Sequence, residues 1–406
     1  MADFASSVHS GVQAQLDRLA LLSPAGDRLG LDRITILLDR LGRPQDALPP
    51  VFHVAGTHGK GSTCAFLRAA LESAGHKVHM FTSPHLVRFN ERIRIAGKLI
   101  EDEPLAALLE EVIDADAGIE SSFFEVTAAA ALLAFARAPA DAAVIEVGLG
   151  GRLDATNVIE APAACGIAGV GLDHEQFLGS SIAAIAAEKA CIAKPGRPLV
   201  ALAQPAEAEA ALIAVAAEHG AILHLEGRDW TIDRSIVPSL AGAHQLRNAN
   251  LAWQMLRSQD SLTVSRSQFD AGVASANWPA RFHKLADGPL TRGIATWVDG
   301  AHNPDAAAAL AELLATRGTM HLVLGFLANK DAEAIVARLA PHARSLTFVP
   351  VNDHDHHDPA TLAERFSGRA AASLADALDG LPVPRLIAGS LYLAGEALAA
   401  NGEAPD

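Results

Sequence analysis

Residues 51–63, with the sequence VFHVAGTHGKGST, constrain the fold more than any other segment of this chain. A short β-type run at residues 51–55 meets a turn that contains three glycines, and an apolar-periodic segment follows from residue 64 to residue 74. A strand, a glycine-rich turn and a helix in this order are typical of a phosphate-binding loop. The segment therefore predicts an α/β domain built around such a loop.

The residues of this loop are suited to binding phosphate groups. Glycines can adopt positive φ and leave room for backbone N–H groups to face phosphate oxygens, while the helix N-terminus adds partial positive charge. Lys60 supplies a mobile cation, and Ser62 or Thr63 supplies a hydroxyl for Mg²⁺. The common pattern GxxxxGK[ST] does not fit, because a glycine separates Lys60 from its hydroxyl. A glycine-rich turn with a surface lysine is the alternative. The three loop glycines are Gly56, Gly59 and Gly61.

Length and composition predict a globular protein of two domains. The chain has 406 residues, which exceeds the usual size of one domain, and 50% of them are hydrophobic. Residues 284–293 hold turn residues without periodicity and form the best linker candidate. We therefore expect one domain at residues 1–286 and a second at residues 287–406.

Net charge limits the class of partner. The formal charge of -15 argues against a nucleic-acid or anionic-membrane partner, since either needs a basic face. The N-terminal residues lack a basic region followed by an apolar one, and no apolar run approaches about 18 residues. The three cysteines have no CxxC spacing, so neither a disulfide framework nor a thiolate metal site is indicated. We expect a cytoplasmic monomer that acts on small molecules.

Two predicted strands end in possible metal ligands. The apolar run 142–147 carries Glu146 next to its last residue and is followed by GLGGRLDATN, and the run 163–170 is followed by His174 in GLDHEQFLG. Open α/β sheets place their ligands at the carboxyl ends of strands, so both side chains are predicted to bind metal, Glu146 as a ligand of Mg²⁺. The glycines after Glu146 do not fit a dinucleotide fingerprint, because no third spaced glycine opens a helix.

Other polar residues allow two interpretations each. Lys189 lies among small apolar residues in a predicted helix at 182–192. It either extends to solvent or sits near a metal as a neutral amine that can be carbamylated, and the residues alone favour solvent. The segment after residue 81 is either a substrate-facing loop or a solvated connection.

Two further segments have one predicted structure each. Residues 229–237 suggest a further β segment, and the run NDHDHHD at 352–358 is predicted to be a polar loop rather than a metal site.

Residues 294–400 repeat an alternation of short apolar runs and helical segments. Strands that alternate with helices indicate βαβ units and a mostly parallel sheet. The predicted fold class is therefore a phosphate-loop ATPase domain with a mostly parallel sheet, followed by a smaller Rossmann-like α/β domain.

A series of motifs in this order resembles the folylpolyglutamate synthase/dihydrofolate synthase family of the Mur ligase superfamily. The resemblance extends from about residue 16 to residue 395, and its strength lies in the joint order of the motifs. They are GTHGKGS, SPHLVRFNERIRIAG, FFEVT, EVGLGGRLDATN, LDHEQFLG, EKA at 188–190, HQLRNA and DGAHNP.

The resemblance implies a role for each matching residue. It assigns catalysis to Lys60, Lys189 and His302, with Lys189 as the carbamylated lysine that holds a second metal. It assigns substrate binding to Phe124 and Asp154. The implied metal-site residues are Ser62, Ser83, Glu146, His174 and Lys189. The implied ATP-binding residues are Gly56, Thr57, Gly59, Lys60, Gly61, Ser62, Thr63, Asn248, Arg281 and Asp299.

The resemblance also implies the reaction. A folate-type carboxylate attacks the γ-phosphate of ATP, and the amine of L-glutamate then attacks the resulting acyl phosphate, with Mg²⁺ at two sites and closure of the second domain. The acceptor would be dihydropteroate or a tetrahydrofolate. Folylpolyglutamate synthesis alone, another Mur-type amino-acid ligation, or nucleotide binding without catalysis are the alternatives.

Three features depart from the family pattern. His58 stands in place of Asn, Ala280 in place of a Gly, and GFLANKD in place of a more acidic loop. The segment SPAGDRLGLDR matches the pterin-side loop only loosely. The departures concern rate and affinity more than reaction class, whereas the loose pterin-side match concerns activity toward dihydropteroate.

Overall fold

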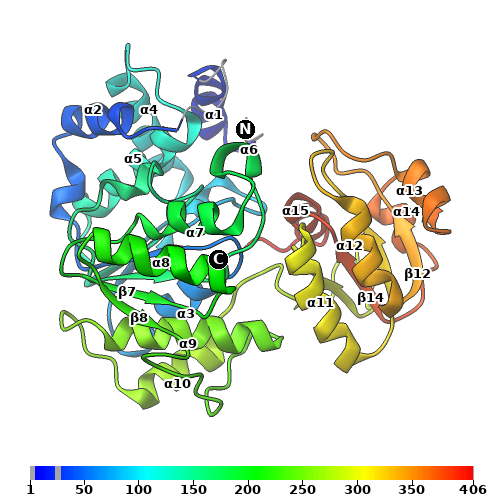
Figure 1. Ribbon diagram of the computed structural model, residues 1–406. Coiled ribbons are helices and arrows are strands. Elements are labelled where there is room, and N and C mark those ends of the chain that lie inside the picture. Colours follow the sequence, from blue (N-terminus) through cyan, green and yellow to red (C-terminus); the bar gives the residue numbers. More distant parts are fainter. Residues whose placement is uncertain (1–4, 23–28, 406) are drawn as a thin grey trace. The chain divides into compact units, whose positions relative to one another are not determined.

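The computed structural model describes residues 5–22 and 29–405, and it divides the chain into two compact units (Figure 1). The first unit comprises residues 5–22, 29–239 and 245–276, and the second comprises residues 240–244 and 277–405. Most of the segment compared with a pterin-side loop, residues 23–28, lies outside the described residues. Residues 284–293 pack within the second unit, where Asn401 Oδ1 accepts hydrogen bonds from the N–H groups of Leu290 and Thr291. The assignment of functional domains to residues 1–286 and 287–406 stays a prediction.

The first unit contains an eight-stranded sheet with the order β4-β3-β2-β5-β1-β6-β7-β8. The six strands from β2 to β8 in this order are parallel, whereas β3 and β4 are antiparallel to their neighbours. The central strand β1 therefore ends between the ends of β5 and β6. At such a point in a parallel sheet, the connections that follow neighbouring strands go to opposite faces of the sheet. The strands are β1 (Val51–Ala55), β2 (Val78–Phe81), β3 (Ile93–Ile95), β4 (Lys98–Leu99), β5 (Ala142–Glu146), β6 (Ala164–Ile167), β7 (Pro198–Ala201) and β8 (Ile222–Leu225).

Strands β1 and β5 are buried along their whole length. Parallel strands covered on both faces need apolar side chains on both, which is why these strands appear as continuous apolar runs in the sequence. His53 is the polar exception within β1. Its ring pairs with Thr156 Oγ1 at 2.8 Å, and burial lowers its pKa to about 3, so the ring is neutral.

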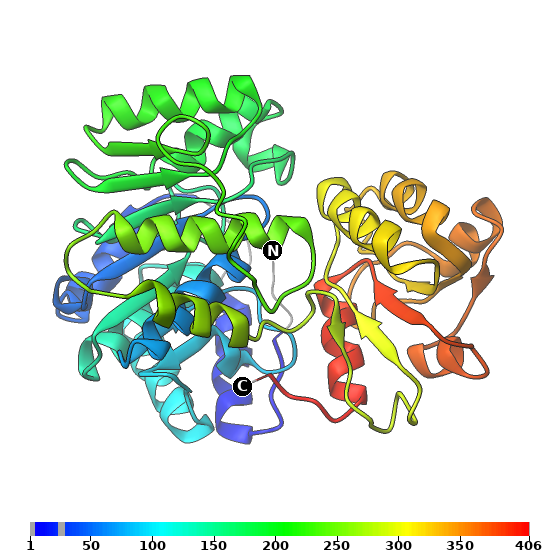
Figure 2. The same ribbon diagram turned by 90° about the horizontal axis from the view of Figure 1, so that it is seen from below.

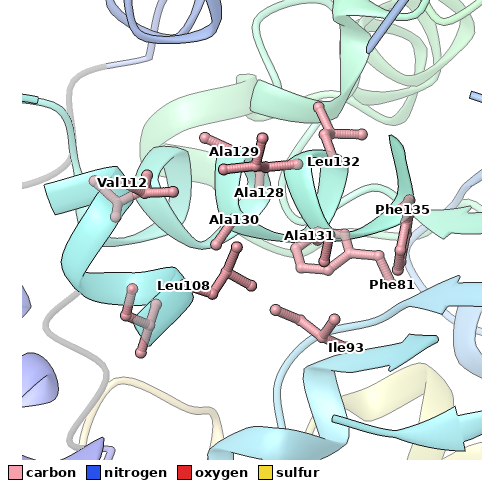
Figure 3. Packing of buried hydrophobic residues seen from close by; sticks show 14 of the residues in the cluster. Phe81, Ile93, Leu108, Val112, Ala128, Ala129, Ala130, Ala131, Leu132 and Phe135 are labelled. Atoms are coloured by element: carbon pink, nitrogen blue, oxygen red, sulfur yellow. The ribbon is translucent and has the colours of Figure 1, made fainter. Parts of the chain in front are cut away.

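Helices cover both faces of this sheet. Figure 3 shows the alanine-rich helix α5 packed beside Phe81 and Ile93. Ala128, Ala129, Ala130 and Ala131 are at most 1% exposed, and their small side chains allow close packing. The helices are α1 (Ser10–Leu22), α2 (Asp32–Arg40), α3 (Lys60–Ser73), α4 (Asp102–Ala115), α5 (Phe123–Arg137), α6 (Glu175–Leu178), α7 (Ile182–Ala190), α8 (Ala206–Glu218), α9 (Ala243–Arg257) and α10 (Arg266–Ser275).

The second unit contains a six-stranded sheet with the order β13-β12-β11-β14-β10-β9. Only β9 is antiparallel to its neighbour. In Figure 2 the yellow to orange helices α11 and α12 lie on one side of this sheet and the red helix α15 on the other. The strands are β9 (His283–Lys284), β10 (Thr296–Val298), β11 (Met320–Leu324), β12 (Ala343–Phe348), β13 (Arg369–Ala370) and β14 (Arg385–Ala388). The helices are α11 (Pro304–Arg317), α12 (Ala332–Leu339), α13 (Pro359–Arg365), α14 (Leu374–Leu378) and α15 (Leu391–Ala400).

Two mostly parallel sheets with flanking helices confirm the predicted fold class. The strand predicted at residues 229–237 is wrong, because Trp230 makes only an isolated bridge to Glu226 and turns follow. The polar segment after residue 81 contains the hairpin of β3 and β4 instead of being entirely loop. Residues 352–358 form a polar loop, in which His357 Nε2 pairs with Lys330 O at 2.8 Å and Asp358 caps α13.

Candidate active site

The phosphate loop joins β1 to α3 through glycines at positions that only glycine fits. Gly59 is the N-cap of α3 with φ of 88°, in the left-handed region. A Cβ there would lie 2.5 Å from Asn248 Oδ1. Gly56 is similarly confined, since its Cβ would lie 2.9 Å from that of Ala168. The contact with Gly59 places Asn248, on α9, directly against the loop.

Thr57 connects this loop by hydrogen bonds to the segment that follows β6. Its N–H donates to Gly169 O at 2.7 Å, and its hydroxyl donates to Gly171 O at 3.0 Å. His58 forms an antiparallel bridge with Gly169, and a Cβ on that glycine would lie 2.4 Å from the His58 ring. His58 therefore packs against the supporting segment rather than simply occupying a surface turn. Thr57 shapes the loop with its hydroxyl.

Lys60, Glu146 and Ser83 meet at the carboxyl ends of β1, β5 and β2. Lys60 Nζ donates to Gly56 O at 3.2 Å and lies 4.0 Å from Glu146 Oε1. Glu146 Oε2 accepts from the N–H of Ser83 at 3.3 Å, and the Glu146 residue is only 5% exposed. A carboxylate is thus held beside the lysine that is predicted to bind phosphate, an arrangement that suits a metal ion shared with nucleotide phosphates.

The two candidate hydroxyls on α3 differ in their surroundings. Thr63 Oγ1 donates to Gly59 O at 2.8 Å, within the first turn of the helix. Ser62, one position earlier, is 2% exposed. Because the Thr63 hydroxyl supports the loop, Ser62 is the better candidate for a metal-binding hydroxyl.

Lys189 is buried on α7 and is only 5% exposed, so the prediction from the residues alone that it extends to solvent is wrong. Burial first, and then the charge of Lys60, lower its pKa to about 7, whereas Asp173 and Asp154 act in the opposite direction. Its amine is therefore substantially neutral near neutral pH. A neutral amine can react with CO₂, whereas an ammonium cannot.

The lowered pKa of Lys189 has a consequence for stability. Between pH 7 and the unfolded value of about 10.5 the unfolded chain binds more protons, so stability rises with pH across this window. Lys189→Met is expected to raise the free energy of unfolding of the metal-free protein by a few kcal/mol at pH 6 and by less at pH 9. Urea midpoints at the two pH values check this, and an equal gain at both would contradict it.

The loop after Glu146 lies directly on the backbone of α7. A Cβ on Gly151 would lie 2.5 Å from Glu188 O and 2.8 Å from Lys189 O, so only glycine permits this approach. Asn157 Nδ2 donates to Arg152 O at 3.1 Å and to Cys191 O at 3.2 Å. These contacts fix Lys189 relative to the strand that carries Glu146.

Gly151→Ala is expected to destabilise the first unit by about 1–3 kcal/mol and to lower turnover, because the added methyl group displaces α7. Gly30→Ala is the matched control for stability, since nothing lies within 4 Å of the Cβ that it adds. Urea denaturation and initial rates measure the two effects. Equal stability of the two variants would show that α7 does not depend on this contact.

His174 lies on the loop between β6 and α6 with φ of 53°. Its N–H donates to Asp173 Oδ1 at 2.9 Å, and its Nε2 is 4.0 Å from the same oxygen. Asp173 was not predicted from the sequence, although a carboxylate beside a predicted metal ligand at a strand end was the available signal. Within residues 5–22 and 29–405, no three His, Cys, Asp or Glu side chains gather to hold a metal by themselves.

The two predicted substrate-binding residues occupy different surroundings. Phe124 packs on Gly148, where an added Cβ would lie 2.3 Å from its ring, next to the end of β5. Asp154 is 2% exposed and accepts from the N–H groups of Leu149 at 2.8 Å and Thr156 at 2.9 Å. Burial raises the pKa of Asp154, and these hydrogen bonds oppose the rise. The carboxylate of Asp154 is thus engaged in shaping the loop, and its substrate contact stays a prediction.

The second unit holds its own cluster at the carboxyl end of β10. Asp299 accepts from the N–H groups of Phe282 at 2.7 Å and Ala301 at 2.9 Å. Burial raises its pKa, and the nearby charge of Arg281 lowers it. His302 Nδ1 pairs with Gly300 O at 2.8 Å.

Ala280 adopts a left-handed conformation immediately before this cluster. Its φ is 58°, a value that is strained for a residue with a Cβ. This explains why a glycine would suit the position.

Comparisons with known proteins agree with this geometry. A family model described as Mur ligase, glutamate ligase domain, matches residues 280–382. Dihydrofolate synthase/folylpolyglutamate synthase of Escherichia coli K12 is 36% identical over 77% of this chain and 75% of its own length. This chain belongs to the folylpolyglutamate synthase/dihydrofolate synthase family. The sequence-based recognition of the family is therefore confirmed.

Solved structures of folylpolyglutamate synthases extend the agreement to the whole fold. The Mycobacterium tuberculosis enzyme, complexed with ADP and AMPPCP, has a TM-score of 0.88 and 31% identity and covers 98% of this chain and 100% of its own. The bifunctional enzyme with Mn, AMPPNP and L-glutamate bound has a TM-score of 0.85 and 29% identity, over 96% and 97% of the two chains. Among the described residues of this family member, no helix is long and apolar enough to cross a membrane.

Proposed function

We propose that this protein ligates L-glutamate to a folate-type carboxylate at the expense of ATP. The observation that supports this most is the cluster at the strand ends of the first unit. In this cluster, Lys60 of the phosphate loop lies 4.0 Å from the buried carboxylate of Glu146. A second lysine, Lys189, is buried and has a pKa of about 7. A protein that only bound nucleotide would need the loop but not the buried Lys189.

The residues present fit a divalent metal bound together with ATP. Glu146 offers a buried carboxylate, Ser62 and Ser83 offer hydroxyls, and His174 offers an imidazole. Mg²⁺ typically takes one or two carboxylates, with water and substrate phosphates completing its shell. Bound metal would neutralise charge on the phosphate oxygens. We assign Lys189, as a carbamate, to a second metal site.

The first step of the proposed reaction is phosphoryl transfer. An oxygen of the acceptor carboxylate attacks the γ-phosphorus of ATP, the bond to the ADP oxygen breaks, and an acyl phosphate forms. Lys60 neutralises negative charge on the transferring group from the phosphate loop. Asn248, which packs on Gly59, is assigned to the nucleotide. In the second unit, Arg281 and Asp299 are assigned to ATP and His302 to the phosphoryl group.

The second step forms the amide. The neutral amine of L-glutamate attacks the acyl carbon, the bond to the phosphate oxygen breaks, inorganic phosphate leaves with the electron pair, and the nitrogen loses one proton to water. An acyl phosphate hydrolyses readily, so the site must exclude water while the amine attacks. Phe124, packed on Gly148 beside the end of β5, supplies an apolar ring for the aromatic acceptor.

The acceptor assay tests this function. The protein is incubated with ATP, Mg²⁺ and L-glutamate, together with either dihydropteroate or a reduced folate, and ADP and the glutamylated product are measured. Product from both acceptors is the result that we expect. Product from folates alone would restrict the activity to folylpolyglutamate synthesis, and no product from either acceptor would refute the proposal. The expectation of a cytoplasmic monomer without nucleic-acid or membrane partners belongs to the same proposal.

A further inference from the structure

Three basic side chains lie together at one edge of the sheet of the second unit. His321 is the second residue of β11, Arg385 opens β14, and Arg344 is the second residue of β12. His321 pairs in register with Arg385 on one side and with Ser345 on the other. We call His321, Arg344 and Arg385 the basic edge. Parallel strands place it at the amino ends of the strands, opposite the edge at which β10 leads into Asp299.

The basic edge contacts neutral oxygen atoms. Arg344 Nε donates to Thr319 Oγ1 at 3.1 Å, and its Nη1 lies 3.4 Å from Val383 O. Arg385 Nη2 donates to Leu381 O, and His321 Nδ1 pairs with Ser345 Oγ at 2.8 Å. Within the described residues, neither arginine of the basic edge forms an ion pair with a carboxylate. For the buried Arg385 this leaves a guanidinium without a counter-charge, in a chain with 47 acidic and 32 basic residues.

Arg385 is the least satisfied member of the basic edge. The residue is only 3% exposed, and its buried Nε has no hydrogen-bond partner among the described residues. Buried charges are normally paired, because leaving one unpaired forfeits the solvation that water supplied. Capping of the turn after α14 explains the contact with Leu381. It supplies no negative charge to balance the guanidinium of Arg385 or of Arg344.

The charges of both arginines of the basic edge act on His321. Partial burial lowers the pKa of His321, and the charges of Arg344 and Arg385 lower it further. An anion between these groups would neutralise the guanidinium charges and favour the protonated imidazole. Arginine presents a planar set of donors that matches the oxygens of phosphate and carboxylate groups.

We propose that the basic edge is a binding site for a small oxyanion, separate from the ATP site. The exposed Arg344 and the imidazole of His321 contact the oxyanion, and the buried Arg385 supplies fixed positive charge behind them. A phosphate group and a carboxylate share this chemistry, and the test distinguishes them.

The test follows the imidazole resonances of His321 by NMR in the full chain, assigned with His321→Gln. ADP is present throughout at one equivalent, so that it occupies the phosphate loop without leaving free nucleotide phosphate to compete at the basic edge. Inorganic phosphate, acetate and sodium chloride are titrated separately at matched ionic strength. We expect a saturable rise in the pKa of His321 with phosphate or with acetate, and the anion that causes it identifies the ligand class. A change that sodium chloride reproduces would overturn the proposal, because it reports screening.

Arg344→Ala is expected to weaken binding of that anion about tenfold, the loss of one charge-assisted hydrogen bond. Arg344 is exposed, so this variant should fold, and its turnover without added anion should equal that of the unmodified chain. Arg338→Ala removes the same charge from an exposed position on α12 and is the matched control. Equal affinities of the two variants would contradict a specific site.

Discussion

Lys60→Ala is expected to lower kcat by about a thousandfold or more, because it removes the cation that the phosphate loop holds beside Glu146. Lys60 Nζ is already positioned by Gly56 O at 3.2 Å, so little reorganisation is needed when charge develops on the transferring phosphoryl group. Rates of ADP formation under saturating substrates measure the effect.

Lys98→Ala is the matched control for this prediction. Lys98 is an exposed lysine on β4, so its loss tests a change in net charge alone. We expect its turnover to match that of the unmodified chain. Residual turnover of Lys60→Ala within tenfold of this control would mean that the transferring phosphate is neutralised by other groups.

Lys189→Ala is expected to reduce kcat by about 10²–10³-fold while ATP still binds with nearly unchanged affinity. Lys189 is buried against the loop that follows Glu146, and its low pKa makes the amine reactive towards CO₂. Added bicarbonate should not restore turnover, since the variant has no amine to carbamylate. Turnover and nucleotide affinity are measured on the same preparation.

Lys194→Ala controls for the loss of a neighbouring lysine, whose Nζ donates to Asn157 O at 3.2 Å. A similar loss of turnover in both variants would indicate that this part of the fold, rather than the amine of Lys189, carries the effect. Unchanged turnover in Lys189→Ala would refute the carbamate.

The strand predictions succeeded where burial alone determines the pattern. The bounds of β1 agree with the sequence, and those of β5 differ by a single residue, because both strands are covered on both faces and consist almost entirely of apolar residues. The prediction at residues 229–237 failed because a short apolar pattern does not show whether a neighbouring strand is available to pair. Among residues 229–237, only Trp230 forms a β-bridge, and that bridge, to Glu226, is isolated.

The candidate site was predictable to the extent that strand order determines it. Glu146 ends β5 and Lys60 follows the neighbouring parallel strand β1, so their proximity follows from a parallel sheet. The burial of Lys189 did not follow from its own helix, where flanking alanines are equally compatible with a side chain that extends to solvent. It depends on the loop at Gly151, which approaches α7 from elsewhere in the chain. The role of Asp154 was hidden for a different reason, because its partners are groups of its own loop, whose turn the sequence pattern did not specify.

The fate of a carboxylate oxygen tests the proposed chemistry most directly. The acceptor is labelled with ¹⁸O in its reacting carboxylate and incubated with the protein, ATP, Mg²⁺ and L-glutamate, and the released phosphate is analysed by mass spectrometry. Transfer through an acyl phosphate predicts one ¹⁸O atom in the phosphate for each amide formed. Phosphate without the label, or ADP formed without acceptor and L-glutamate, would contradict ATP-dependent ligation by this route.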